Sequence, residues 1–218
     1  MANFYPKSTA ELIVAIETAN SNGLPDTIFL QAGLIYEITT AHNAGLFSAV
    51  GGQNGLPVIS SLINIVGNGA TLKRVASNTV DGNFRILAIQ AGGNLTLRST
   101  ILRDGRLAER TEPVSGAGIA NLGTLLMDGC VVTNHINRNF DGYGGCVFSS
   151  SNATLDIRNS QITAGIATWG SGVYNSFGTF TINNSRISDN SLGPAIYGSG
   201  TGTVTNSAIV RNVAQDGG

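Results

Sequence analysis

The spacing of apolar residues near the N-terminus predicts one helix. In STAELIVAIETANSNG, the apolar residues that recur on one helical face are Leu12, Ala15, Ile16 and Ala19. Ser8 stands three residues before Glu11, which is the spacing of a capping box, and Asn22-Gly23 is typical of a helix C-terminus. We therefore expect an amphipathic helix over 9–20.

The pattern changes after this helix. Alternating apolar and polar residues in DTIFLQAG and LIYEITT predict two short strands. The region over 41–61 is rich in glycine and polar residues and predicts a long loop. From Leu62 onward no helical spacing of useful length is found, and the chain repeats itself instead.

Five tripeptides align at one position of this repeat: Arg98-Ser99-Thr100, Asp128-Gly129-Cys130, Arg158-Asn159-Ser160, Asn183-Asn184-Ser185 and Thr205-Asn206-Ser207. Their middle residues follow one another at steps of 30, 30, 25 and 22 residues. The same alignment contains three apolar columns. They are Leu102, Val132, Ile162, Ile187 and Ile209; Leu97, Met127, Ile157, Ile182 and Val204; and Ile119, Val147, Val173 and Ile196.

Each repeat thus supplies three short strands, each with an inward apolar residue. At about 3.3 Å per strand residue, three such strands form one coil of a parallel β-helix. Stacking the coils about 4.8 Å apart pairs their backbones and places like residues on like. At the bend this stacks Asn159, Asn184 and Asn206. Asparagine tolerates a left-handed bend, and its amide can hydrogen-bond along the stack.

We predict one continuous domain. Residues 1–61 hold the capping helix, the first strands and the loop, and residues 62–218 hold the coils. The repeat has inserts from Arg103 to Gly118 and from Asn134 to Gly145, which predict loop-built surfaces where a solenoid usually binds. The terminal AQDGG stands where a new coil begins in earlier repeats. This predicts that the rest of a longer β-helix, or another chain, covers the C-terminal end.

Several motifs resemble a known family: TAELIVAIETANSNGLPDTIFLQAGLIYEIT, LPVISSLINIVGNGATLKR, GGNLTLRST and the GxIxN…GTxTIxNSxISxN repeats. They resemble the right-handed parallel β-helix domains of large bacterial surface proteins, of the polymorphic outer membrane protein and CSLREA types. The resemblance covers nearly the whole chain, although STAELIVAI replaces that family's cysteine-containing signature. It implies an all-β, right-handed parallel β-helix with three strands per coil and an N-terminal amphipathic capping helix. It also implies an extracellular or outer-membrane-surface location, as in adhesins and autotransporter passengers.

Composition narrows the function classes. Charged residues make up 11% of the chain and the formal net charge is -1, so we expect no nucleic-acid partner. No apolar run predicts a transmembrane segment, and no secretory signal is seen at the start, which fits a cytosolic protein or a mature domain. Cys130 and Cys146 form no disulfide framework and predict buried thiols. His42 and His135 stand alone, so we expect no metal and no cofactor.

An enzyme is the main alternative, because polysaccharide lyases and glycosidases share this fold. The charged candidates are Asp104, Asp128, Asp156, Asp189, Arg98, Arg103 and Arg158. In the alignment Arg98, Asp128 and Arg158 occupy one outward position on successive coils, which predicts a solvated ion-pair ladder. Asp189 and Arg211 stack in the same way. No two acids recur at one position on adjacent coils, which is one way to arrange the paired carboxylates of a glycosidase.

An outward aromatic column is the first candidate binding surface. The residues after the third apolar column are Ala120, Phe148, Tyr174 and Tyr197, with Trp169 in the adjoining loop. Aromatic faces on a flat sheet can stack against sugar rings or a partner protein. The structural alternative is a cross-strand ladder that stabilises the sheet.

A threonine-rich column is the second candidate: Asn94, Thr124, Thr154, Thr179 and Thr201. Thr181 and Thr203 complete two Thr-x-Thr rows, an arrangement also found in ice-binding solenoids. Leu126 and Asp156 interrupt the flanking column, and threonine favours strands in any case.

We therefore expect a non-catalytic module, either a rigid stalk or an adhesin-type domain. Its expected partner is a polysaccharide or a surface protein of a host or neighbouring cell. The candidate binding residues are Phe148, Trp169, Tyr174, Thr179, Thr181 and Tyr197, and no catalytic or metal-binding residue is assigned. The alternative is a polysaccharide lyase or glycoside hydrolase of this fold, and a minor alternative is an ice-binding solenoid.

Overall fold

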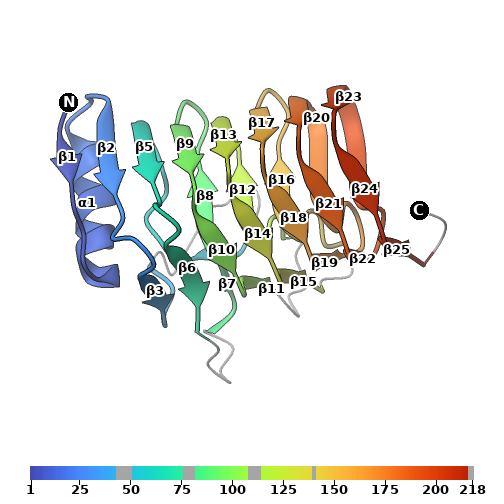
Figure 1. The fold of residues 1–218 in the computed structure, drawn as a ribbon, viewed down its shortest axis with the longest axis horizontal. Coiled ribbons are helices and arrows are strands. Elements are labelled where there is room, and N and C mark those ends of the chain that lie inside the picture. The colour runs from blue at the N-terminus through green and yellow to red at the C-terminus, as the bar shows by residue number, and fades with distance from the viewer. Residues whose placement is uncertain (43–50, 76–81, 108–113, 139–140, 216–218) are drawn as a thin grey trace.

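The computed structural model is a stack of short parallel strands closed at one end by a helix (Figure 1). It describes residues 1–42, 51–75, 82–107, 114–138 and 141–215. The parts of the predicted loop and inserts at 43–50, 108–113 and 139–140, and the last residues of AQDGG at 216–218, lie outside this description. No helix in the described part is long and apolar enough to cross a membrane.

Helix α1 (Thr9–Ser21) lies at the N-terminal end of the stack (Figure 1). The hydroxyl of Ser8 caps it by accepting a hydrogen bond from the Glu11 N–H, and Asn22 ends it, as predicted. All four residues of the predicted apolar face are buried in the main core. The capping signals and the apolar face together explain why this segment is a helix while the rest forms strands.

All the strands of the described residues pair in parallel, in four sheets. The 11-stranded sheet contains β1 (Asn3–Phe4), β2 (Asp26–Phe29), β5 (Leu62–Val66), β8 (Leu87–Ile89), β9 (Asn94–Arg98), β12 (Ile119–Asn121), β13 (Thr124–Asp128), β16 (Val147–Ser149), β17 (Thr154–Arg158), β20 (Val173–Asn183) and β23 (Ile196–Thr205). The long strands β20 and β23 join two faces of the stack, because β20 pairs with β16 through its first residues and with β17 through its last.

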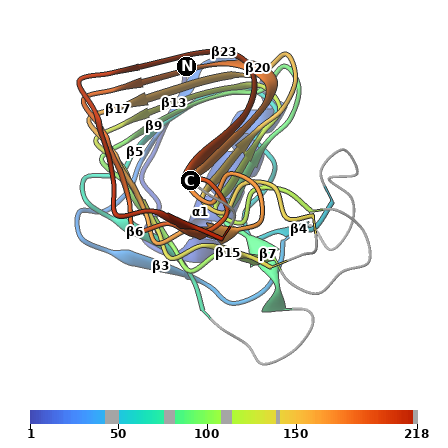
Figure 2. The ribbon, with the colours of Figure 1, turned by 90° about the vertical axis from the view of Figure 1, so that its right-hand side faces the viewer.

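The other sheets form the remaining faces. The seven-stranded sheet contains β3 (Ile35–Ile38), β6 (Thr71–Arg74), β10 (Ile101–Arg103), β14 (Val131–Thr133), β18 (Gln161–Thr163), β21 (Arg186–Ser188) and β24 (Ala208–Val210). The five-stranded sheet contains β11 (Arg106–Leu107), β15 (Ile136–Asn137), β19 (Ile166–Ala167), β22 (Ser191–Leu192) and β25 (Val213–Ala214). Strands β4 (Gln53–Asn54) and β7 (Phe84–Arg85) pair separately. Viewed along the stack, corresponding strands of successive coils lie over one another (Figure 2).

The three predicted apolar columns are confirmed residue by residue. Leu102 pairs with Val132, Leu97 with Met127, and Ile119 with Val147, and each column continues in register through later coils. Most of these residues are buried in one core that also includes the helix face. The expected three strands per coil are incomplete, because a fourth, two-residue strand follows the third in each of five coils. Two residues are too few to show an alternating pattern, so this fourth strand could not be predicted from the repeat.

The predicted bend is confirmed as well. Asn159, Asn184 and Asn206 all have left-handed backbone, with φ of 50°, 46° and 51°. The amide of Asn184 donates to Oδ1 of Asn159 at 2.8 Å, so the expected ladder of side chains forms.

A second left-handed column was not predicted. It follows the third strand of each coil and contains Asp104, Asn134, Ala164, Asp189 and Arg211.

In each of these coils, the serine that follows the bend asparagine takes part in a ladder of hydroxyl groups inside the stack. The Ser160 hydroxyl accepts from the Cys130 N–H at 3.0 Å, Ser185 accepts from the Ser160 N–H at 3.1 Å, and Ser207 accepts from the Ser185 N–H at 3.0 Å. Each of these hydroxyls also donates to the carbonyl two residues before it. The column supplies acceptors that the bent backbone cannot, so the buried N–H groups are paired.

A second interior ladder uses larger polar side chains. His135, Asn190 and Asn212 accept from the N–H groups of Gly105, Gly165 and Asn190, respectively. Each also approaches a carbonyl of the apolar column one coil earlier: Leu102, Ile162 and Ile187. His135 therefore accepts a backbone N–H and contacts a backbone carbonyl, as asparagine does in the later coils.

One arginine is wholly inside the protein. The Arg85 guanidinium bonds to Oδ1 of Asn54 at 2.7 Å and to the carbonyl of Ser115 at 3.0 Å, with further carbonyl contacts to Gly51, Gly52 and Gly116. It joins the segment before β4 to the segment before β12. Five acceptors offset much of the cost of removing its charge from water.

The hydroxyl ladder predicts a specific stability effect. Ser160→Ala should destabilise the fold by about 1–3 kcal/mol, because the buried Cys130 N–H loses its acceptor. Ser160→Thr should cost less, since Thr100 occupies this column in an earlier coil. Urea unfolding followed by circular dichroism measures both variants, with the exposed Ser151→Ala as the control. Equal stability of the alanine and threonine variants would contradict the role of the ladder.

Candidate functional site

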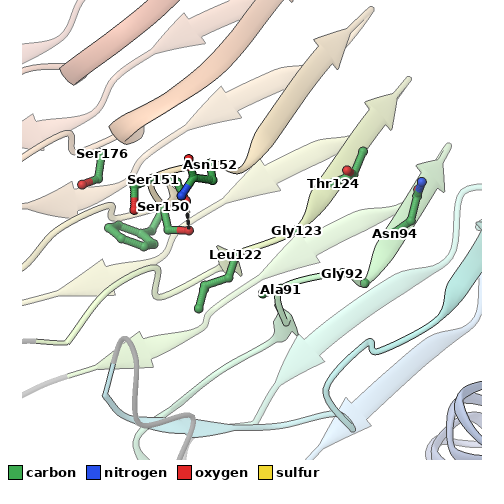
Figure 3. Close-up of a pocket in the computed structure, with 12 residues that line it drawn as sticks. Ala91, Gly92, Asn94, Leu122, Gly123, Thr124, Ser150, Ser151, Asn152 and Ser176 are labelled. Atoms are coloured by element: carbon green, nitrogen blue, oxygen red, sulfur yellow. Dashed lines mark hydrogen bonds between the residues drawn. The ribbon is translucent and has the colours of Figure 1, made fainter.

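A polar hollow opens at one corner of the stack, which we call the corner hollow (Figure 3). Three successive connections meet there: residues 90–93 between β8 and β9, 122–123 between β12 and β13, and 150–153 between β16 and β17. The middle connection has two residues and each of its neighbours has four, so a short loop lies between two longer ones. The space left between the longer connections has a volume of about 680 Å³.

Hydrogen-bonding groups dominate the lining of the corner hollow. The lining residues are Ala91, Gly92, Gly93, Asn94, Leu122, Gly123, Thr124, Phe148, Ser150, Ser151, Asn152 and Ser176. They offer hydroxyls, amides and glycine backbone beside an aromatic and a leucine side chain. None of these lining residues is titratable. The site can therefore donate and accept hydrogen bonds and cover a small apolar surface, but it contains no general acid or base.

Close backbone packing forms the floor of the corner hollow. A Cβ on Gly123 would lie 2.2 Å from the Gly93 carbonyl oxygen, so no larger residue fits without moving the chain. Beneath the corner the buried Asn121 accepts from the Gly123 N–H at 3.1 Å and donates to the Thr154 carbonyl at 3.0 Å. Asn121 thus holds adjacent coils at a fixed distance, which makes the floor rigid.

The predicted aromatic column forms, but it is mostly covered. Phe148 stacks on Tyr174 with ring centroids 5.6 Å apart, and Tyr174 on Tyr197 at 5.8 Å. Phe148 is only 7% exposed, in a small hydrophobic cluster with Ala120, and Tyr143 packs against Tyr174 from the side. The expectation that Phe148 presents a free aromatic face is therefore wrong. Tyr143, which belongs to the insert over 134–145, packs against the cluster that contains Phe148 and against Tyr174.

The far end of the aromatic column is more open. Tyr197 is 42% exposed, and its ring lies 5.0 Å from that of the half-buried Trp169. These two residues belong to the last coils, so they are separated along the stack from the corner hollow. The structure thus brings only Phe148, of the predicted aromatic residues, into the hollow.

The threonine-rich column forms in the predicted register. Asn94 pairs with Thr124, Thr154 with Thr179, and the column continues to Thr201. Thr179 and Thr181 are exposed, and they pair with Thr201 and Thr203 in the last coil. In earlier coils Asp156 and Leu126 occupy the place of Thr181, so the regular threonine array spans two coils.

The corner hollow lies where the two predicted columns meet. Phe148 comes from the aromatic column, while Asn94 and Thr124 come from the threonine-rich column. Thr179, Thr181, Trp169, Tyr174 and Tyr197 do not line it. Sequence analysis missed the connection at Ser150, Ser151 and Asn152, although the difference in spacing between repeats contained the signal.

The candidate acids lie in separate ion pairs on the surface. Asp128 pairs with Arg98 at 3.5 Å, as the ladder predicted. Arg158 pairs instead with Asp156 on its own strand, because that carboxylate lies on the same face and within reach.

The other two acids are also paired. Asp104 bonds to the neighbouring Arg103 at 2.9 Å. Asp189 and Arg211 form the predicted pair across coils, and the hydrogen bond from Arg211 lowers the pKa of Asp189. Within the described residues, no group of three or more His, Cys, Asp or Glu side chains could hold a metal ion.

Burial shifts the pKa values of the two cysteines and of His135. Burial raises the pKa of Cys130 to about 11 and that of Cys146 to about 12, so both remain thiols at neutral pH. Burial lowers the pKa of His135 to about 4, which keeps the ring neutral. Nδ1 of His135 accepts from Gly105, so the proton is on Nε2 facing Leu102. Nε2 of His42 lies 3.1 Å from Oε1 of Glu17.

No family model, curated protein or solved structure matches the chain.

The aromatic column predicts different effects at its centre and at its more exposed end. Tyr174→Ala should destabilise the fold by about 2–4 kcal/mol, because Tyr174 packs between Phe148, Tyr143 and Tyr197. Tyr197→Ala should cost about half as much or less, since that ring is more exposed. Thermal and urea unfolding of both variants test this. A Tyr197 variant as unstable as the Tyr174 variant would contradict the packing argument.

His135 predicts a loss of stability in acid. Its folded-state pKa of about 4 lies below the ordinary value of 6.5, so between these values the unfolded chain binds more protons. The free energy of unfolding should therefore fall as pH decreases from 6.5 to 4, by about 3 kcal/mol from this group. His135→Asn keeps an acceptor and a donor, as Asn190 does, and should remove this part of the slope. An unchanged slope in urea unfolding across this pH range would contradict the assignment.

Proposed function

We propose that the protein is a non-catalytic carbohydrate-binding module that holds an uncharged saccharide in the corner hollow. The observation that carries this proposal is the lining: hydroxyls, amides and backbone groups beside Phe148 and Leu122, with no titratable side chain among them. The two columns predicted from the sequence meet there, so the repeat itself supplies part of the site.

The chemistry of the lining favours a sugar. Sugar hydroxyls both donate and accept hydrogen bonds, and they match the hydroxyl and amide groups of Thr124, Ser151 and Asn152. A sugar ring also has an apolar C–H face, which can lie against the half-buried Leu122. The volume of about 680 Å³ is within the range of about 300–1,000 Å³ typical of small-ligand sites. Because no cation lines the hollow, a neutral saccharide fits better than an acidic one.

We also infer that the stack is a right-handed parallel β-helix from a secreted or surface-displayed bacterial protein. Support comes from the parallel register of every column and from the resemblance of the repeats to polymorphic outer membrane protein and CSLREA-type domains. Such a stack is a stiff rod, so it can act as a stalk while a corner displays the site.

The enzyme alternative has less support. A lyase or glycosidase needs a positioned acid or base beside the sugar. The candidate carboxylates of Asp104, Asp128, Asp156 and Asp189 are each paired with an arginine, and none lines the corner hollow. A catalytic role would require one of these pairs to open.

Filling the corner hollow should abolish saccharide binding. A glycan array of neutral and acidic oligosaccharides identifies the ligand, and calorimetry then measures its affinity. Thr124→Trp places a large ring in the hollow and should weaken binding at least about tenfold, which corresponds to about 1.4 kcal/mol. Thr133→Trp is the matched control, because Thr133 is a partly exposed strand residue on another face.

Two results would contradict this proposal. One is an array on which no neutral saccharide binds. The other is equal binding by the Thr124 and Thr133 variants. Release of unsaturated sugar products absorbing in the ultraviolet would favour the lyase alternative.

A further inference from the structure

A bulge in β20 carries an aromatic side chain that is almost fully in solvent. The register between β20 and β23 shifts after Ser176, so that β20 contains one residue more than β23 at this point. Phe177 is in the bulge, and its side chain is 73% exposed. The extra residue therefore places an aromatic ring on the surface at a corner of the stack.

The backbone of Phe177 is unfavourable for a large residue. Its φ is 59°, in the left-handed region that glycine and asparagine adopt easily and bulky residues avoid. Among the described residues it is the only aromatic one with such a backbone. Glycine or asparagine would serve the bend better, so the fold alone does not account for the ring. Residues held in such conformations cluster at functional sites.

The coil that follows the bulge leaves this ring uncovered. The segment of β23 that lies against the bulge is Gly198-Ser199-Gly200, whose largest side chain is serine. The buried amide of Asn175 holds the two segments together, because it donates to the Gly178 carbonyl at 2.9 Å and to the Ser199 carbonyl at 2.7 Å. The ring is thus exposed although a coil is stacked on each side of it.

The bulge adjoins the corner hollow. Ser176, the residue before Phe177, lines the hollow, and Figure 3 shows it beside Ser151. A Cβ on Gly178 would lie 2.6 Å from the Ser150 carbonyl oxygen, so the bulge packs directly against the connection that forms one wall of the hollow. Phe177 itself does not line the hollow, and its ring lies outside the rim.

The hollow and the bulge follow one line along the stack. Their connections belong to four successive coils and lie over one another in register: 90–93, 122–123, 150–153 and 176–178. Successive coils are about 4.8 Å apart, so the line is about 14 Å long. This length exceeds that of one sugar ring.

We propose that the ligand of the corner hollow is a neutral oligosaccharide that lies along the stack, with one sugar in the hollow and a later sugar against the ring of Phe177. This inference rests on the proposed function. Phe148, the aromatic residue of the hollow, is only 7% exposed, so Phe177 supplies the aromatic face that the hollow lacks. The apolar C–H face of a sugar ring can lie on such a face while its hydroxyls remain in water.

The dependence of affinity on saccharide length tests this inference. Calorimetry, or magnetic resonance titration for weak ligands, compares uncharged cello-, manno- and chito-oligosaccharides of one to four residues. In at least one series the tetrasaccharide should bind at least about tenfold more tightly than the monosaccharide. Phe177→Gly should remove this gain and leave monosaccharide affinity unchanged, because the hollow is intact.

Matched variants separate the ring from the fold. Glycine suits the left-handed backbone, so the urea midpoint of Phe177→Gly should equal or exceed that of the unsubstituted protein. Phe177→Trp keeps an aromatic face and should keep the gain in affinity. Tyr5→Ala is the control, because Tyr5 is a 64% exposed aromatic residue beside β1, at the helix-covered end of the stack. It should leave the gain unchanged.

Three outcomes would overturn the inference. They are a tetrasaccharide that binds no more tightly than its monosaccharide in every series, a gain that survives Phe177→Gly, and an equal loss of the gain in Tyr5→Ala. If Thr124→Trp still weakens saccharide binding in these cases, the proposed function stands and only the second sugar position is lost. If no saccharide of any series binds, both proposals fail.

Discussion

The structure depends on one constraint: each coil must accept the backbone N–H groups that the previous coil directs toward it. Along the strands, parallel pairing meets this need. At each bend a carbonyl still accepts from the bend residue, but a side chain accepts from the N–H of the residue that follows it. Ser160, Ser185 and Ser207 do so at one bend, and His135, Asn190 and Asn212 at another. An unpaired buried N–H costs about 1–3 kcal/mol, so these small side chains are as important to the stack as its apolar columns.

This constraint separates the parts of a coil that can vary from those that cannot. Strands and bends are fixed by the coils above and below them, while the connections between strands can change length. The corner hollow arises from such a change, since residues 122–123 make a shorter connection than their neighbours on either side. Gly123 and Asn121 hold that corner tightly. The proposed binding site therefore lies where the repeat is broken, between coils that the stack holds in place on each side.

The two ends of the stack are chemically different. At one end α1 covers the stack, and its apolar face is buried in the core. At the other end of the described chain, Val204 and Ile209 are exposed, whereas Ile182 and Ile187, at the same positions one coil earlier, are buried.

The sequence by itself determined the helix, the three apolar columns and the asparagine bend. Residues at equal positions in successive coils contact one another, so a repeat in the sequence is a contact in space. It did not reveal the two-residue strands, because Ile136–Asn137 and their equivalents are too short to show a period. Nor did it show that Phe148 is covered, that Arg158 pairs with Asp156, or that three connections enclose a hollow. Only the tertiary structure decided these features, because they depend on connection lengths and on neighbours from inserts that follow no repeat.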